Sequence, residues 1–414
     1  MENKVIDRLD NPEGLESLYR EKPERFVLWL TEAVKARPDS DILKVWQARL
    51  YYKNPQVADK ATASLWLMIF LALILVFAVK LPQLIEVDHN GYYRRFIPFG
   101  IINALICYFM YVATLSTNIK RFIVAGSGLC FLLLFFLPDN NNSASILMAT
   151  IHIPLVLSSL LAAAYMGNGW KQYELRLRYI RYLGEMLILT KIILLGGMVL
   201  ALITFALFSV IGLSIGEWYM DNIVLAGLVA APIVATYLYD EVLNRESKLA
   251  TIISNVFAPL FLITVILYLS AMLYQQQSPY ADRDFLISFN GLLVFVLAIT
   301  VFSIAGKRES AHSRSIDVVN MALLGVTLLI NTVALTAIVF RLTEYGVTPN
   351  RVVVTGANLL IFIHLILLLK AYIYYFKGSS RIEPLNKAVA GYLPVYSVWS
   401  VFISFALPLI FWFE

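Results

Sequence analysis

The alternation of polar and apolar stretches divides this chain into a polar first domain, residues 1–60, and a long apolar second domain, residues 61–414. About eleven apolar stretches follow one another in the second domain, each long enough to cross a hydrocarbon core of about 30 Å as a helix. The pattern predicts an all-α fold, a polytopic membrane helix bundle of about 11 transmembrane helices with a small N-terminal cytoplasmic helical unit. The predicted spans cover about 62–81, 96–115, 119–137, 144–166, 188–213, 220–239, 251–274, 285–305, 319–340, 352–376 and 394–413.

The N-terminal unit carries three helix signals. Asn11 and Pro12 supply the capping side chain and the first-position proline of a helix start. Apolar residues that recur every four positions predict a second helix over residues 23–35, and a third begins near residue 41. Eleven Lys and Arg balance eleven Asp and Glu in this unit. Because the unit is too small for a large core, we expect it to pack on the membrane domain or on a cytoplasmic protein.

The composition narrows the range of functions. Of the 414 residues, 59% are hydrophobic and 15% are charged, against about 25% charged residues in a soluble domain. The net charge of +5 is typical of basic cytoplasmic loops, so membrane lipids are the expected partners and nucleic acid is not. Cys107 and Cys130 lie inside predicted spans without metal-ligand spacing. We therefore expect neither a metal nor a cofactor.

The loop charges predict how the chain is threaded. If the N-terminus is cytoplasmic, most Lys and Arg residues of the membrane domain fall in cytoplasmic loops, as the positive-inside rule requires. The opposite loops then carry Arg94, Arg95, Arg283, Arg341 and Arg351. With an odd number of spans, the C-terminus is expected outside.

A few polar positions inside the apolar region change the picture further. Residues 169–187 mix aromatic and basic side chains, which predicts an amphipathic helix at the cytoplasmic membrane interface. Because almost no acidic residue falls near the middle of a span, a proton-coupled pump is disfavoured. His152, which precedes Ile153-Pro154, and His364 are candidates to line a cavity. The alternative for each histidine is an ordinary hydrogen bond to a neighbouring helix.

The external connection at residues 341–351 is the best-defined motif. Thr348-Pro349 has the residues of a helix start. Arg341 and Arg351 run against the charge trend, so each is expected to have a partner: Glu344 in an ion pair with Arg341, or an external anion that matches the guanidinium fork. A capped structural loop and an anion or lipid-headgroup site are both open. The candidate ligand-binding residues here are Arg341, Glu344, Tyr345 and Arg351.

The same eleven residues, RLTEYGVTPNR, resemble the signature Arg-x-x-x-Tyr-Gly-x-Thr-x-x-Arg of a family of bacterial multi-pass inner-membrane proteins catalogued as a domain of unknown function. The matching positions are Arg341, Tyr345, Gly346, Thr348 and Arg351. Residues 11–20, followed by Pro23 and Phe26, are similar to the N-termini of some members. The resemblance extends over most of the chain and implies a bacterial inner membrane, but it implies no activity.

Three hypotheses for the function follow. The first is binding or transport of a small anion or lipid-type ligand, with His152 and His364 along a polar path. The second is a membrane enzyme that acts on a lipid-linked substrate at the outer leaflet, where Glu86, Asp88 and His89 would join the 341–351 loop. The third is a membrane scaffold for a cytoplasmic partner. A non-enzymatic function is favoured, because the sequence has no nucleophile elbow, zinc-protease motif or phosphate-binding loop.

Overall fold

The computed structural model describes residues 4–21, 23–51, 55–85, 89–140, 142–274, 283–307, 314–377 and 382–414. Within these ranges the regular structure is helical, and no strand is found. The chain separates into two compact units, Met1–Ala63 and Ser64–Glu414. The all-α prediction is therefore confirmed.

The first unit is a small helical domain with its own apolar core. It contains α1 (Pro12–Glu21), α2 (Pro23–Ala36) and α3 (Asp41–Tyr51), which begin where the sequence predicts. The side chain of Asn11 caps α1 by accepting a hydrogen bond from the Gly14 amide at 2.9 Å. Phe26 and Trp46, with ring centroids 4.8 Å apart, join α2 to α3 in the core.

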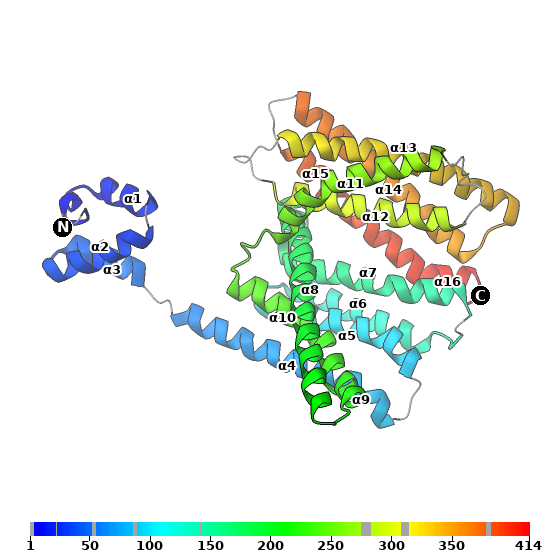
Figure 1. Ribbon diagram of the computed structural model, residues 1–414, viewed down its shortest axis with the longest axis horizontal. Helices are drawn as coiled ribbons and strands as arrows, with labels where there is room; N and C mark the ends of the chain where they lie inside the picture. The colour runs from blue at the N-terminus through cyan, green and yellow to red at the C-terminus, as the bar shows by residue number, and fades with distance from the viewer. Residues whose placement is uncertain are drawn as a thin grey trace. The chain divides into compact units, whose positions relative to one another are not determined.

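The second unit consists of long apolar helices and short connecting turns (Figure 1). Its helices are α4 (Pro55–Ile85, of which the part from Ser64 belongs here), α5 (His89–Val112), α6 (Thr117–Phe136), α7 (Ala144–Met166), α8 (Tyr173–Val210), α9 (Gly216–Tyr219), α10 (Leu225–Tyr237), α11 (Leu249–Tyr274), α12 (Arg283–Ala305), α13 (Arg314–Tyr345), α14 (Pro349–Lys377), α15 (Glu383–Val401) and α16 (Leu407–Ile410). π-helical turns at Met220–Val224, Leu238–Val242 and Phe402–Ala406 flank α10 and continue α15.

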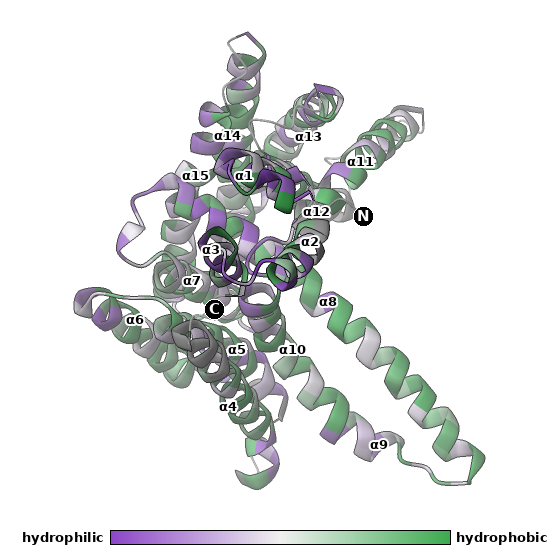
Figure 2. Ribbon diagram, turned by 90° about the vertical axis from the view of Figure 1, so that its left-hand side faces the viewer, coloured by the Kyte–Doolittle hydropathy of each residue, from purple (hydrophilic) through white to green (hydrophobic). Residues whose placement is uncertain are grey.

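Ten helices of the described residues are long and apolar enough to cross a membrane, by length and composition. The predicted span at 285–305 corresponds to α12, whose described apolar part, Phe289–Ala305, is shorter than the other ten. Many large apolar side chains are exposed on these helices, and the ribbons of Figure 2 are green over much of their length. Such a surface needs lipid around it, so the helices build a multi-pass membrane protein.

The helices of the second unit pack in two groups, with α8 between them (Figure 1). One hydrophobic core joins α4, α5, α6, α7 and α10. Two further hydrophobic cores join the helices from α11 to α15. Tyr179 and Tyr182 of α8 belong to the first core, whereas Leu177 and Ile180 belong to a core of the second group. The first half of α8 is therefore a wall that the two groups share.

This placement of α8 corrects the prediction for residues 169–187. The segment from Tyr173 onward is the beginning of a continuous helix, and Tyr179 and Tyr182 are 1% and 0% exposed. These two aromatic side chains therefore contact protein and not lipid headgroups. The second half of α8 is instead the exposed part, and it extends beside α9 away from the other helices (Figure 2).

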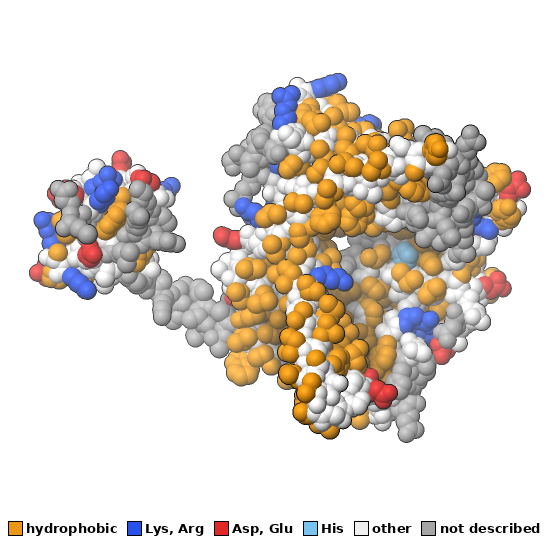
Figure 3. Space-filling model, in the orientation of Figure 1, with side chains coloured by type: hydrophobic (Ala, Val, Ile, Leu, Met, Phe, Trp, Pro, Cys, Tyr) orange, Lys and Arg blue, Asp and Glu red, His pale blue; other side chains and the backbone are white. Residues whose placement is uncertain are grey.

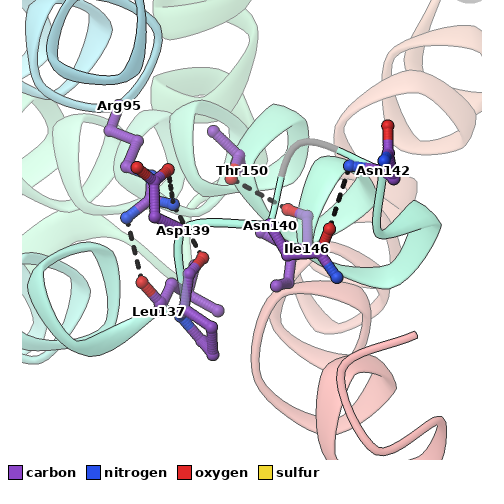
Figure 4. Close-up of polar contacts among 8 residues, drawn as sticks. Arg95, Leu137, Asp139, Asn140, Asn142, Ile146 and Thr150 are labelled. Carbon is purple, nitrogen blue, oxygen red and sulfur yellow. Dashed lines mark hydrogen bonds and ion pairs between the residues drawn. The ribbon is translucent and has the colours of Figure 1, made fainter. Parts of the chain in front are cut away.

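Arg95 of α5 holds the connection between α6 and α7 in place (Figure 4). Its guanidinium group donates to the carbonyl oxygens of Leu137 at 2.9 Å and Pro138 at 2.8 Å, and it pairs with Asp139 at 3.2 Å. Ser143 then caps α7 by accepting a hydrogen bond from the Ile146 amide. An arginine of the predicted outer face is thus bound by the chain itself.

Candidate functional site

A cavity of about 410 Å³ lies where the two helix groups meet. Figure 3 shows a hollow beside α8, with a histidine on its wall in pale blue. α7, α8, α12, α14 and α15 supply the lining, which consists of His152, Leu155, Ser158, Ser159, Ala162, Tyr179, Leu183, Val294, Leu297, Ala357, Leu360, Ile361, Leu393, Tyr396, Ser397, Trp399 and Ser400. The volume falls in the range of about 300–1,000 Å³ that is typical of small-molecule sites.

The lining of the cavity is mostly apolar, with a few hydroxyl groups. Ser159 of α7 donates a hydrogen bond to Ser397 of α15 at 2.8 Å, which joins the two helices across the cavity wall. Among the described residues that line the cavity, none is Lys, Arg, Asp or Glu. The site therefore suits an apolar guest with a small polar group better than an ion.

His152 lines this cavity, and one of its ring nitrogens, Nε2, has no hydrogen bond to the residues that the structure describes. Its Nδ1 lies 2.8 Å from the carbonyl oxygen of Met148, one turn earlier in α7. Because a carbonyl oxygen can only accept, Nδ1 carries the proton, and Nε2 of the neutral ring is a hydrogen-bond acceptor. The sequence-predicted candidate His152 thus lines a cavity and has an atom left to bind a ligand.

His364 lies behind the same wall. It is 2% exposed, its Nδ1 is 2.9 Å from the hydroxyl of Tyr396, and its ring stacks on Tyr392 at 4.4 Å. Tyr396 itself lines the cavity. The structure therefore brings the two predicted histidines to one site, His152 directly and His364 through Tyr396.

Trp399 closes part of the wall, and Gly356 makes room for it. A Cβ atom added to Gly356 would lie 2.0 Å from Cη2 and 2.2 Å from Cζ2 of the indole. The indole Nε1 is buried and has no hydrogen-bond partner among the described residues. Trp399 thus contributes to the lining and carries a buried donor without a described partner, which is uncommon in folded proteins.

The 341–351 loop has a different construction. Arg351 donates to the carbonyl oxygens of Tyr345 and Gly346, both at 2.6 Å, and its guanidinium lies 5.6 Å from the Tyr345 ring. Gly346 has a φ of +76°, a backbone conformation that glycine adopts without strain. The Thr348 hydroxyl accepts from the Arg351 amide at 3.4 Å, so the predicted helix start is confirmed. These contacts explain the spacing of the motif as a loop closed by its own arginine.

The other predicted residues of the outer face do not gather at a described site. Glu344 is exposed, and its pairing with Arg341 stays a prediction. Glu86 and Asp88, as well as the side chain of His89, lie outside the described residues. The hypothesis of an enzyme at the outer leaflet therefore stays a prediction.

Sequence reasoning missed a partly buried charged cluster at the junction of α5, α7 and the turn and loop that follow α10. Tyr108 donates to Asp240 at 3.0 Å, and Asp240 forms an ion pair with Arg245, whose guanidinium lies 5.4 Å from the Tyr165 ring. Burial alone would lower the pKa of Arg245, but the hydrogen bond to Asp240 and the attraction of its negative charge together outweigh burial, so the pKa is raised. These contacts join α5 and α7 to the segment that follows α10.

Glu185 of α8 is a fully buried acidic residue. It accepts hydrogen bonds from the Ala250 amide at 2.8 Å and from the Ser247 hydroxyl. A carboxylate that accepts from the first turn of α11 also faces the positive end of that helix dipole. The signal in the sequence is an acid within a long apolar helix, followed by a polar turn that starts the next helix.

No family model matches this chain, and no match was found among curated proteins or among solved structures. The site is therefore interpreted from its own geometry and chemistry.

Proposed function

We propose that this multi-pass membrane protein binds a lipid-type ligand, an apolar chain with a small polar group, in the cavity between its two helix groups. The observation that carries the proposal is the lining of the cavity: apolar side chains, several hydroxyls and the Nε2 acceptor of His152. Burial of an apolar chain stabilises the complex by about 25 cal/mol per Å² of apolar surface removed from water.

The position of the cavity supports a role in binding or transport. Ligand sites of helical membrane proteins often lie between helix groups that can rearrange around the ligand. Here α7 lies on one side, and α12, α14 and α15 lie on the other. A small anion, the other ligand of the first hypothesis, has less support because no described lining residue is Lys or Arg.

We place the protein in a bacterial inner membrane with the N-terminus in the cytoplasm and the C-terminus outside. The support is the charge of the loops and the resemblance of residues 341–351 to the uncharacterised family. A cytoplasmic protein that binds the N-terminal unit is a further proposal, which rests on that unit being compact by itself.

Native mass spectrometry of the purified protein tests the ligand. Ala357 lines the cavity, and Ala357→Leu would fill part of it. Ala206 is exposed on α8, so Ala206→Leu is a matched control with the same added atoms. We expect a lipid-type mass on the wild type and on the control, and its loss from Ala357→Leu. Equal occupancy of all three proteins would reject the cavity as the site, and a small inorganic anion as the bound mass would reject the ligand class.

A further inference from the structure

A line of buried polar side chains runs along one face of α13, outside the cavity. Asp317, Asn320, Thr327 and Asn331 are each at most 4% exposed. Their spacing of three, seven and four residues keeps them on the same side of the helix. From the first to the last they extend about 21 Å at 1.5 Å per residue. Polar side chains buried in a membrane bundle are costly unless they find partners, so the partners identify what the line does.

The hydrogen bonds of two asparagines determine which way their amides point. The Nδ2 of Asn331 donates to the backbone carbonyl of Asn358 at 3.3 Å. The Nδ2 of Asn358 donates to the carbonyl of Val354 at 2.8 Å and to Oδ1 of Asn290 at 2.9 Å. A backbone carbonyl cannot donate, so neither amide can be flipped. Both Oδ1 atoms, of Asn331 and of Asn358, are buried without a donor among the described residues.

Thr327, one turn before Asn331 on the same face, adds a third oxygen. A threonine in a helix usually satisfies its hydroxyl on the carbonyl four residues earlier, as Thr332 and Thr355 do on α13 and α14. The hydroxyl of Thr327 makes no such bond and is buried without a described partner. It therefore differs from the hydroxyls of Thr332 and Thr355, which bond to their own helix.

The three oxygens have one chemical feature in common. Asn358 uses both of its amide N–H groups and Asn331 uses one, while Oδ1 of Asn331, Oδ1 of Asn358 and the Thr327 hydroxyl can all accept. An excess of uncharged oxygen acceptors matches a hard cation, since amide and hydroxyl oxygens are ligands of such ions. Because the ligands carry no charge, a single positive charge is far less costly to bury than two.

We propose that α12, α13 and α14 hold a monovalent cation, with Thr327, Asn331 and Asn358 as its ligands and Oδ1 of Asn290 as a further oxygen nearby. Asn358 follows the cavity-lining residue Ala357 on α14. The cation site and the cavity thus share a helix, but the cation site does not depend on what the cavity binds.

The test is thermal unfolding of the purified full-length protein in sodium, potassium or choline chloride at equal ionic strength. We expect a saturable rise of Tm with sodium or potassium and no rise with choline, since only the free ion that binds the folded state stabilises it. Asn331→Leu should abolish this response. Thr327→Val preserves the shape of the side chain and removes one ligand, and should raise the half-saturating concentration by about tenfold, which corresponds to about 1.4 kcal/mol.

Asn255→Leu is the matched control. Asn255 is an asparagine of α11 whose Oδ1 already accepts from Ser303 at 2.7 Å. Its loss should lower Tm equally in every salt and leave the response to the alkali ion intact. An equal Tm of the wild type in all three salts, or an unchanged half-saturating concentration in Thr327→Val, would overturn the cation site. Ordered water at the three oxygens in a high-resolution structure, together with equal Tm values, would assign them to water instead.

Discussion

The contact between Gly356 of α14 and Trp399 of α15 allows a direct test of how the cavity wall is built. In Gly356→Ala, the new Cβ would lie 2.0 Å from Cη2 of the indole, whereas ordinary contact begins at 3.4 Å. The ring atom would have to move by at least the difference, about 1.4 Å. The indole is rigid, so its movement either narrows the cavity or separates α14 from α15.

Two opposing energies determine the effect on stability. Overpacking of this kind costs about 1–3 kcal/mol. Replacing a helical glycine by alanine stabilises the helix by about 1 kcal/mol. The net loss of stability is therefore about 0–2 kcal/mol, so a stability measurement alone is a weak test of the contact between Gly356 and Trp399. Ligand occupancy is the sensitive one, because a shift of 1.4 Å at the wall changes the shape of the site itself.

The assay compares Tm and native-mass-spectrometry occupancy of Gly356→Ala with Gly391→Ala, a glycine of α15 with no atom within 4 Å of its added Cβ. Gly391→Ala should keep the ligand and gain stability, while Gly356→Ala should lose most of the ligand. In a Trp399→Leu background the added methyl group at Gly356 should become harmless, because the obstructing ring is gone. If Gly356→Ala is equally damaging in that background, the close contact with Trp399 is not the cause and the reasoning fails.

Three further predictions follow from the ion pairs and the loop. Arg351→Ala should lower stability by about 1–3 kcal/mol in thermal unfolding. Arg351→Lys should not restore it, because both carbonyls accept from the planar Nη1, and the shorter lysine side chain does not place its nitrogen there. Full restoration by lysine would contradict the loop-closing role. Asp317→Asn leaves Lys307 buried without its ion-pair partner and should cost about 3–5 kcal/mol, whereas the double variant with Lys307→Met should recover much of that loss. The hydrogen bond from Arg49 lowers the pKa of Glu16 below its ordinary value of 4.5, and the hydrogen bond from Arg20 lowers it further. Hydrogen-exchange protection of α1–α3 should therefore be full above pH 4.5 and should fall as the pH drops through the lowered pKa. Glu16→Gln should remove this pH dependence.

The helices and their starts could be predicted from the sequence because their signals are local. Apolar stretches of spanning length predict helices whatever they pack against, and Asn11 and Thr348 are capping residues next to prolines. The burial of Tyr179 and Tyr182 could not be predicted this way. A mixed aromatic and basic helix fits a lipid headgroup region or a groove between helices equally well, and only the packing of α5, α7 and α10 around α8 decides between them.

The sequence could predict only some of the residues that line the cavity, for a related physical reason. His152 could be singled out because a polar ring in an apolar helix must bind something. Its apolar neighbours could not, since leucines that line a cavity and leucines that face lipid are the same residues.

For the arginines of the predicted outer face, the sequence predicts that a partner exists but not which partner it is. A guanidinium against the charge trend does require a partner, and for Arg95 and Arg351 that partner includes backbone carbonyls of the chain. Sequence can state the requirement, but a carbonyl of the protein and an external anion meet it equally well. Arg351→Lys separates the two, because a lysine keeps the positive charge that an anion needs but does not place a nitrogen where Nη1 meets the two loop carbonyls. Ligand binding that survives in Arg351→Lys while the loop is destabilised would therefore place an anion at the loop in addition to its structural role, and loss of stability alone would leave the cavity as the site.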